Sequence, residues 1–450
     1  NDVALHASSR DDGNIHPGVD LHSNTLKLKY LNMAKEMWPG LAKELGFKYV
    51  KTGQALTFED HKLIFNLFVK YKARKNNIKN ISYYKKDEFL KEEPNIDNPN
   101  IQGGIIFNDA AQVAPYEVTI AFAENAITNG AKIYLDTYVK DMKVENNEIK
   151  EVITSKGTIY PKLVINAAGV FSEDIAKLAD DHFFSIHPRK GTDLILDKKV
   201  LTKYAKHTLG LKHLSDASGK SKTKGGGTIV TVDGNFLLGP DAYETPFKED
   251  FSTTKESIIN ILNKQKPLFK NISTKDIITY FSGTRACTYE EDFIIQEGKW
   301  TKNIIHAAGI QSPGLSCSPA IAKDVAKLAA TLLEDTRFNA NFNPNRVAPV
   351  DFASLPIEKK DELIKRNPNY GEIICRCEKI SKQEILDAIR RPLTPNTTDG
   401  IKRRTRAGMG RCQGGFCGPQ VLKILAEEKG LLYTDIAKKG VAKVLDKKSK

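Results

Sequence analysis

Apolar residues recur along this chain with two different periods. Two short apolar runs, 163–165 and 304–305, each end in a polar residue followed by Ala-Ala-Gly, which predicts two buried strands that lead into turns. Longer stretches with apolar residues at helical spacing predict helices at 24–45 (interrupted at Pro39), 60–77, 115–130 and 320–335. Strands that alternate with helices in this way are typical of α/β domains.

Turn and cap residues refine this picture. Asn146-Asn147 and Asp233-Gly234 each separate two apolar runs, and such residues tolerate the positive φ that hairpin turns require. An antiparallel sheet is therefore expected alongside the α/β part, within residues 181–300. Ser172 is predicted to cap the helix after the first Ala-Ala-Gly, and Ser318 to cap the helix after the second, with Pro319 in its first turn.

Composition describes an ordinary soluble protein. The 450 residues are 40% hydrophobic and 27% charged, no run approaches the ~18 apolar residues of a membrane span, and no secretory signal is visible. We therefore expect a cytoplasmic protein without a transmembrane segment, with peripheral association at the inner face of the membrane as an option. The net charge of +13 comes from lysines spread along the chain without a basic-aromatic motif, which disfavours nucleic acid and suits anionic ligands.

Four of the six cysteines form a compact pattern near the C-terminus, Cys375-Arg376-Cys377 followed by Cys412 and Cys417. Four thiolates suit zinc or an iron–sulfur cluster. The one-residue gap of Cys375-x-Cys377 fits structural zinc poorly, and a disulfide pair is disfavoured by the low cysteine count. The basic run at 402–411 either offsets the charge of such a site or is a solvated face.

The stretch GEIICRCEKISKQEIL followed by DGIKRRTRAGMGRCQGGFCGPQVLKILAEE resembles the [2Fe-2S]-binding domain similar to bacterioferritin-associated ferredoxin, which is found appended to FAD-dependent dehydrogenases. The resemblance implies a [2Fe-2S] cluster with Cys375, Cys377, Cys412 and Cys417 as its ligands. Local signals agree with two short helices behind the thiolates. Ser381-x-x-Glu384 is a capping box, Pro419 suits a first helical turn, and Gly430 suits a helix end.

The first 46 residues resemble the FAD-dependent glycerol-3-phosphate dehydrogenase family, a branch of the D-amino-acid-oxidase-like flavoproteins, through Ala7-Ser8-Ser9-Arg10 and Asn14-Ile15-His16-Pro17-Gly18. In that family a βαβ unit with a G-x-G-x-x-G turn precedes this point. No such turn after a strand occurs in this sequence, so we expect that roughly 30–40 residues, one βαβ unit, are missing from the N-terminus.

The resemblance implies which residues meet FAD and substrate. Small residues let the main chain approach a flat ring, and a loop that feeds a helix N-terminus presents a partial positive charge to the flavin edge. His16 is implied as a flavin- or substrate-facing group, and Val139 as a contact of the adenine end. The implied cofactor-binding residues are Ser8, Ser9, Val139, Ala168, Gly169, Gly309, Gln311, Ser312, Gly314 and Leu315.

Arg285, in the segment FSGTRAC, matches the arginine that this family turns toward the substrate's anionic group. An arginine suits that role because its planar fork binds phosphate or carboxylate through two parallel hydrogen bonds. Cys287 and Cys317 are expected to be small core residues. The catalytic base is not identified by the sequence, although His16 is a candidate.

The expected fold is α/β and α+β: a Rossmann-like FAD-binding domain truncated at its N-terminus, an antiparallel-sheet substrate domain, and a small helical [2Fe-2S]-binding domain. We assign residues 1–335 to the FAD-dependent oxidoreductase domain and 371–432 to the cluster domain. A linker at 336–370 and a loose basic tail at 433–450 complete the chain. Within the first domain the FAD-binding parts are about 1–46, 115–180 and 300–335, and the substrate parts about 47–114 and 181–299.

The resemblance implies an enzyme that oxidises sn-glycerol 3-phosphate with FAD and passes electrons through the cluster to a protein partner or a quinone-linked subunit. Two alternatives stay open. An L-2-hydroxy acid, such as 2-hydroxyglutarate, or an amino acid or opine would suit Arg285 equally well, because its carboxylate offers the same geometry. A non-catalytic, cluster-carrying fragment without FAD is the other alternative, since the dinucleotide-binding turn is not in the sequence.

Overall fold

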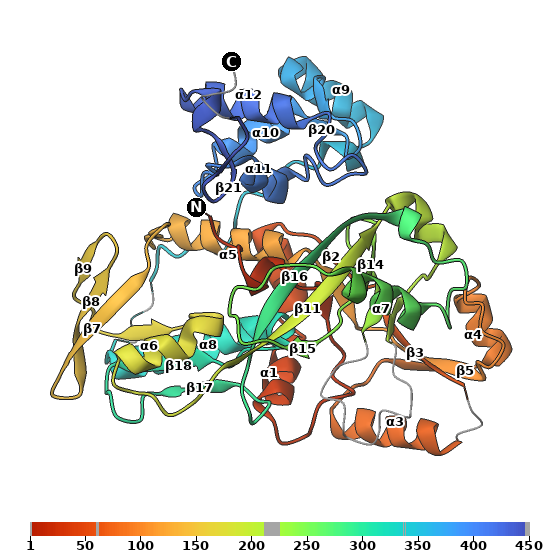
Figure 1. Ribbon diagram of the computed structural model, residues 1–450, viewed down its shortest axis with the longest axis horizontal. Helices are drawn as coiled ribbons and strands as arrows, with labels where there is room; N and C mark the ends of the chain where they lie inside the picture. Colours follow the sequence, from red (N-terminus) through yellow and green to blue (C-terminus); the bar gives the residue numbers. More distant parts are fainter. Residues whose placement is uncertain (1, 60–62, 211–225, 336, 338, 446–450) are drawn as a thin grey trace.

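The computed structural model describes residues 2–59, 63–210, 226–335, 337 and 339–445. A large body carries the sheets, and a smaller, mostly helical unit formed by the C-terminal residues sits on one side of it, next to helix α5 (Pro115–Thr128) (Figure 1). Within these residues, no helix combines the length and the apolar character needed to cross a membrane.

The largest sheet of the body is a mostly antiparallel one of nine strands. Its order is β15-β11-β14-β13-β12-β3-β5-β4, with β16 paired along the whole length of β11, and only β12 and β3 run parallel. Helices α4 (Lys86–Glu92) and α7 (Lys255–Gln265) pack on its strands. The strands are β3 (Gln54–Phe58), β4 (Ile81–Lys85), β5 (Gly103–Phe107), β11 (His187–Leu196), β12 (Thr208–Gly210), β13 (Gly227–Val230), β14 (Phe236–Gly239), β15 (Tyr243–Glu244) and β16 (Ile277–Cys287).

The expected hairpins are present. Gly234 has φ +78° in the turn between β13 and β14, and Asn146 and Asn147 have φ +53° and +61° between β7 (Val139–Glu145) and β8 (Glu148–Thr154). Positive φ at both central residues matches the twist of antiparallel strands, which is why Asn-Asn serves there. Strand β9 (Gly157–Ile159) completes this three-stranded meander. The antiparallel substrate sheet and the α/β part are thus confirmed.

The two apolar runs before Ala-Ala-Gly form β10 (Val164–Asn166) and β18 (Ile304–Ala308), which pair in parallel, with β17 (Ile294–Glu297) on the far side of β18. Strand β18 is fully buried, as predicted. The prediction that both strands are buried is wrong for β10, where Ile165 is 46% exposed. The reason is position: among the described residues β10 pairs with β18 alone and forms the edge of its sheet.

Two helix starts differ from the predictions. Helix α8 (Gly314–Leu332) begins before Ser318, so Ser318 is not its cap and Pro319 lies inside it. Pro319 lacks an N–H for the Leu315 carbonyl, and the Ser318 hydroxyl donates to that oxygen at 2.8 Å instead, which removes the usual cost of the proline. Helix α6 (Ser172–Leu178) includes Ser172 in its first turn, where its hydroxyl bonds back to Gly169 and caps nothing.

The N-terminal segments line the body around these sheets. Helices α1 (Leu26–Ala34) and α2 (Trp38–Leu45) replace the single interrupted helix, and Pro39 is accommodated in the first turn of α2 rather than breaking it. Cys287 and Cys317 are completely buried, as expected. The other elements of the body are η1 (Ala7–Ser9), β1 (Asn14–Ile15), β2 (Tyr49–Val50), α3 (Leu63–Lys75), β6 (Ala111–Val113), η2 (Gly169–Phe171), η3 (Lys198–Lys203) and η5 (Thr274–Asp276).

Regular structure continues on both sides of the residues assigned to the cluster domain. Residues assigned to the linker form α9 (Ile357–Arg366), and the Phe352 and Tyr370 rings stack 5.6 Å apart within the domain. Residues 437–443, assigned to a loose tail, form a hairpin instead, because β21 packs on α11. The domain comprises η6 (Phe352–Ser354), α9, η7 (Pro368–Tyr370), β19 (Ile373–Cys375), β20 (Ile380–Ser381), α10 (Lys382–Ile389), α11 (Thr398–Thr405), α12 (Gly418–Lys429), η8 (Tyr433–Asp435), β21 (Ala437–Lys439) and β22 (Ala442–Lys443).

Candidate active site and cluster site

The two Ala-Ala-Gly turns lie side by side. Asn166 of β10 is in register with His306 of β18, so both turns leave the sheet at the same end. The buried His306 ring fixes this end: its Nδ1 lies 3.1 Å from the Asn166 amide and its Nε2 2.8 Å from the buried Asp181 carboxylate. Burial lowers the pKa of His306, which favours the neutral ring. The sheet therefore presents two closely spaced main-chain turns at one edge.

These turns have the shape that a flat ligand needs. Gly169 and Gly309 both have positive φ, +59° and +63°, and no atom lies within 4 Å of the position where a Cβ on Gly169 would sit. Ala168 is half-buried beside this open space. A side chain at either glycine would be strained, so the backbone itself forms the surface here.

The loop after Gly309 leads directly into α8. Gln311 is buried, with its side chain turned inward: its carbonyl accepts from the Cys287 thiol at 2.8 Å and its amide donates to Glu291 at 3.0 Å. Its side chain therefore serves the scaffold, and the predicted cofactor contact is left to the backbone. Gly314 and Leu315 open the 19-residue helix, whose N-terminus carries a partial positive charge. Half-buried Ser312 precedes them in the same loop.

His16 is held against this helix end. Its backbone N–H donates to the Ser316 hydroxyl at 3.0 Å, and that hydroxyl donates to the Asn14 carbonyl at 3.0 Å. The imidazole Nδ1 lies 3.2 Å from the Asn14 side-chain amide. The structure thus brings two segments 300 residues apart in sequence, the His16 loop and the first turn of α8, into direct contact.

Arg285 lies in a recess made by two paired glycines. Gly191 of β11 is in register with Gly283 of β16, and both leave the face of the sheet without side chains. The Arg285 guanidinium occupies the space over Gly191, where a Cβ would meet it at 2.4 Å, and Arg10 occupies the space over Gly283. Arg10 donates to the Ser282 carbonyl at 2.7 Å, whereas half-buried Arg285 has no hydrogen bond or ion pair among the described residues.

An acidic group beside Arg285 is kept from neutralising it. Asp193 is 3% exposed, and burial, together with the nearby Asp12, Asp11 and Asp241 carboxylates, raises its pKa well above the usual value. Among the described residues, its Oδ1 atom has no hydrogen-bond partner. The raised pKa, which Arg285 itself opposes, favours the uncharged form of Asp193 and so leaves more of the Arg285 charge available to an anion. Sequence patterns gave no sign of this buried acid, which stands out only once β11 and the Arg10 loop are placed together.

Three predicted contacts, Val139, Ser8 and Ser9, lie on other elements than the glycine turns and the His16 loop. Val139 begins β7 and packs in a separate apolar cluster with Ile304. Exposed Ser8 and half-buried Ser9 form η1, which rests against β16 and α5, and the Ser9 hydroxyl donates to the His6 carbonyl at 3.3 Å.

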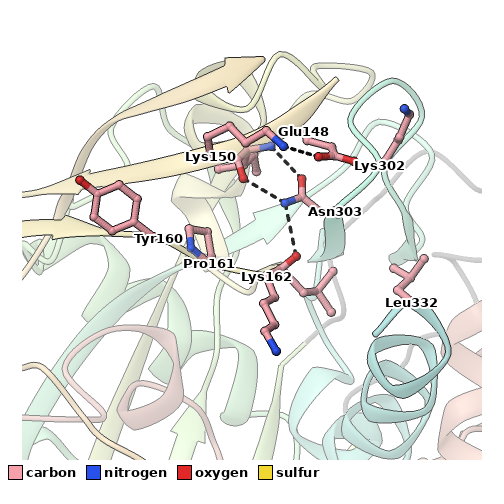
Figure 2. A pocket seen from close by; sticks show the side chains of 10 residues that line it. Glu148, Lys150, Tyr160, Pro161, Lys162, Lys302, Asn303 and Leu332 are labelled. Carbon is pink, nitrogen blue, oxygen red and sulfur yellow. Dashed lines mark hydrogen bonds and ion pairs between the residues drawn. The ribbon is translucent and has the colours of Figure 1, made fainter. Parts of the chain in front are cut away.

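A pocket of about 490 Å³ between the meander and the start of β18 contains none of the predicted site residues. Figure 2 shows Asn303 at its centre, joined to the main chain of Ile149 and of Lys162. These bonds tie the meander to the small sheet. The pocket therefore lies where the meander and the small sheet are joined, away from the predicted site residues.

The four thiols of the cluster domain meet as two pairs. The sulfurs of Cys377 and Cys412 are 3.8 Å apart, and the thiols of Cys375 and Cys417 interact with each other. No three His, Cys, Asp or Glu side chains in the described part of the chain converge as a single metal ion would require. A mononuclear zinc site needs four ligands around one point, whereas a [2Fe-2S] cluster takes two thiolates at each of two irons. The pairing fits the iron–sulfur cluster better than zinc.

Ion pairs next to these thiols join the cluster domain to the body. We call this set the joint. Arg406, in the left-handed conformation at the end of α11, donates to Asp233 at 2.5 Å, to Glu378 at 2.9 Å and to the Tyr116 hydroxyl at 3.2 Å. Its other pairs are Arg411 with Asp197, Lys198 with Glu378, Arg403 and Arg404 with Asp2, and Arg391 with Glu124. The basic run is therefore neither a simple solvated face nor only a counter-charge to the cluster.

Sequence comparison agrees with both halves of this arrangement. A family model described as FAD dependent oxidoreductase matches residues 1–328, and one described as BFD-like [2Fe-2S] binding domain matches residues 373–427. The chain therefore belongs to the FAD-dependent oxidoreductase family and carries a BFD-like [2Fe-2S] domain. Its cofactors are FAD, which the paired glycine turns and the α8 N-terminus suit, and a [2Fe-2S] cluster, which the paired thiols suit.

Several relatives that match most of this chain are named for glycerol 3-phosphate. A glycerol 3-phosphate dehydrogenase of Caloramator mitchellensis is 36% identical over 443 residues, which cover 97% of this chain and 90% of that protein. A glycerol 3-phosphate oxidase of Mycoplasma genitalium is 29% identical over 76% of this chain and 89% of its own length. The dithionite-reduced L-alpha-glycerophosphate oxidase of Mycoplasma pneumoniae, solved with FAD bound, matches with a TM-score of 0.68 and 25% identity over 77% of this chain and 90% of that one.

Proposed function

We propose that this protein oxidises sn-glycerol 3-phosphate to dihydroxyacetone phosphate and delivers the electrons, through its [2Fe-2S] cluster, to a protein partner or a quinone-linked acceptor. The observation that carries the proposal is Arg285, a half-buried guanidinium without an ion pair in the described structure, seated over Gly191. A partly desolvated arginine without an ion pair among the described residues, beside an acid whose pKa is raised, suits a small anion as ligand.

The cofactors and the residues divide the work. When bound, FAD supplies the two-electron acceptor for the carbinol hydrogen and the [2Fe-2S] cluster supplies a one-electron acceptor. Arg285 holds the substrate's phosphate, which fixes the position of the hydroxyl-bearing carbon at the other end of the molecule. His16, anchored through Ser316 and Asn14, is our candidate for taking the hydroxyl proton, because its ring lies in the loop that meets the α8 N-terminus.

The roles proposed for single residues follow from the same geometry. The main chain at Ala168, Gly169, Gly309, Gln311, Ser312, Gly314 and Leu315 forms the surface that faces the flavin, and Ser8, Ser9 and Val139 form its more distant contacts. Cys375, Cys377, Cys412 and Cys417 are proposed as the four cluster ligands, because the thiols already meet in two pairs.

Substrates with a carboxylate remain the second candidate, because Arg285 would bind an L-2-hydroxy acid, an amino acid or an opine through the same fork. Phosphate is preferred because the relatives reported above, which cover most of this chain, are named for glycerol 3-phosphate. The third hypothesis, a fragment that carries only the cluster, is disfavoured by the family match over residues 1–328.

The test is anaerobic addition of sn-glycerol 3-phosphate to the FAD- and iron-loaded protein, with 2-hydroxyglutarate and an opine in parallel. We expect the flavin absorption to bleach with the first compound at far lower concentration than with the others. Arg285→Leu should lower kcat/KM by about 10²–10³-fold, since it removes a charged bidentate contact. Arg337→Leu, a change at an arginine that is 88% exposed, is the control. If only the hydroxy acid bleached the flavin absorption, sn-glycerol 3-phosphate would be ruled out as the substrate and the hydroxy acid would take its place.

A further inference from the structure

The two thiol pairs of the cluster domain differ in their access to solvent. Cys375 and Cys417 are 1% and 2% exposed and belong to the domain's apolar core. Cys377 is exposed and Cys412 is half-exposed. The Phe416 ring, in the loop between Cys412 and Cys417, is 84% exposed. Phe416 therefore places a large aromatic side chain in solvent, in the same loop as the ligand candidate Cys412.

Charge on this side of the domain is positive and unpaired. Arg376 and Lys379 flank Cys377, both are exposed, and neither has an ion pair or hydrogen bond in the described part of the chain. The acid between them, Glu378, is 3% exposed and faces inward to Lys198 and Arg406. The acid next to Cys377 is therefore neutralised by its own partners, whereas the two nearby cations stay exposed to solvent. We call Arg376, Cys377, Lys379 and Phe416 the thiol face.

We propose that the thiol face is the docking surface for an acidic, one-electron carrier protein. The inference rests on the proposed function, because it takes the cluster as the point from which electrons leave the protein. Aromatic and arginine side chains are the residues that anchor protein interfaces, and complementary charge speeds the encounter of redox partners whose contact area is small. A second copy of this chain is a poor occupant, since two molecules with a net charge of +13 repel each other.

The joint and the thiol face use different side chains of the same loops. The residues next to the exposed thiols on the other side, Glu378 and Arg411, are committed to Lys198 and Asp197 of the body. The cluster loops thus contact the body with one set of side chains and present a different set to solvent.

The stoichiometry follows from the substrate. Oxidation of one secondary alcohol to a ketone releases two electrons and two protons. Each carrier molecule accepts one electron without any bond being made or broken, so two carriers are reduced in turn for each substrate consumed. Both protons go to water.

The experiment uses the loaded protein and two haem carriers of opposite charge, the soluble acidic domain of cytochrome b5 and the basic cytochrome c. We expect the protein to bind cytochrome b5 with an affinity that falls as salt is raised, measured by titration calorimetry, and to reduce it faster than cytochrome c on addition of substrate. The double change Arg376→Glu with Lys379→Glu should weaken binding of cytochrome b5 at least about tenfold. Phe416→Ala should weaken it by about fivefold.

A matched control carries the same change in net charge on another surface of the domain. Lys365→Glu with Arg366→Glu alters two exposed residues of α9 and should leave the affinity unchanged. Iron content and the reduction of a small dye should be equal in all variants. If charge reversal lowers the iron content, Arg376→Gln with Lys379→Gln applies the same test, with a smaller expected loss of affinity.

The proposal is overturned if the charge-reversed protein binds and reduces cytochrome b5 as the parent does while dye reduction is normal. It is also overturned if cytochrome b5 binding is unaffected and the same change abolishes binding to phosphatidylserine vesicles, since the face would then meet a membrane. Failure of the substrate to reduce the dye in the parent protein would instead contradict the proposed function, so the two failures are distinguishable.

Discussion

Arginines serve opposite purposes at the substrate recess and at the joint. In the recess, Arg285 lies against Gly191 without an ion pair in the described structure, and Asp193, an acid on which it acts electrostatically, is buried with its pKa raised well above the usual value. At the joint, Arg406 is bonded to two carboxylates and a hydroxyl, and the neighbouring arginines of the domain are each paired with an acid of the body. Arginine therefore lacks an acidic partner in the recess, within the described structure, and has acidic partners at the joint.

The difference shows how pairing separates architecture from function. A buried charge that meets its full set of partners fixes geometry, because removing either member leaves the other without compensation. A half-buried charge without a partner contributes nothing to the fold and is available to a ligand. By this criterion Arg285 is a binding residue, and Arg406 is a positioning residue for the cluster domain.

Arg406→Gln is the sharpest way to break the comparison. It leaves Asp233 and Glu378, which are 8% and 3% exposed, with less positive charge nearby, and we expect a loss of about 3–5 kcal/mol in the free energy of unfolding of the cluster domain. Urea unfolding followed by the visible absorption of the cluster measures this loss. Arg390→Gln removes a more exposed pair with Glu428 and should cost no more than about 1 kcal/mol. Equal losses in the two variants would contradict the distinction.

Glu117, which lies close to the joint residue Asp233, makes the stability of the protein depend on pH. Burial and the neighbouring Asp233 carboxylate raise the pKa of Glu117 to about 7 from its usual 4.5. Because the folded protein binds this proton more tightly than the unfolded chain, the cost of ionising Glu117 is absent below pH 4.5. The cost grows between pH 4.5 and 7 and is complete above pH 7.

Glu117→Gln should therefore stabilise the protein at pH 8 by about 1–3 kcal/mol, and the gain should shrink steadily as the pH falls toward 5. Thermal unfolding across this pH range provides the measurement. Glu358→Gln, at an exposed position of α9, is the control. A gain that does not change with pH would show that the glutamine acts through packing and not through the proton.

Much of the fold followed from local signals. The strands that lead into the two Ala-Ala-Gly runs, the Ser381–Glu384 capping box, and the turns at Asn146-Asn147 and Gly234 are present as predicted, because each depends on neighbours within a few residues. The cysteine spacing gave the cluster domain for the same reason. Helix starts failed where a side chain supplied a bond that the sequence rule assigns elsewhere, as Ser318 does for Pro319.

The recess and the joint could not be predicted, because both arise from distant pairings. Gly191 and Gly283 lie opposite each other, next to Arg285, because β11 and β16 pair in this register. Neither segment carries a sequence signal that identifies the other as its partner. Arg406 finds Asp233 across 173 residues. The role of the basic run at 402–411 could not be decided from the sequence. Its partners are acids of the body, which are distant in sequence and are identified only in the folded structure.

The central claim is that electrons from one substrate reach the cluster of the same chain. Anaerobic addition of sn-glycerol 3-phosphate to the loaded protein, followed by electron paramagnetic resonance at low temperature, tests it directly. We predict that the signal of a reduced [2Fe-2S] cluster develops as the flavin absorption bleaches, and that protein with Cys377→Ala and Cys412→Ala bleaches without this signal. Flavin bleaching in the unaltered protein without any cluster signal would contradict the claim.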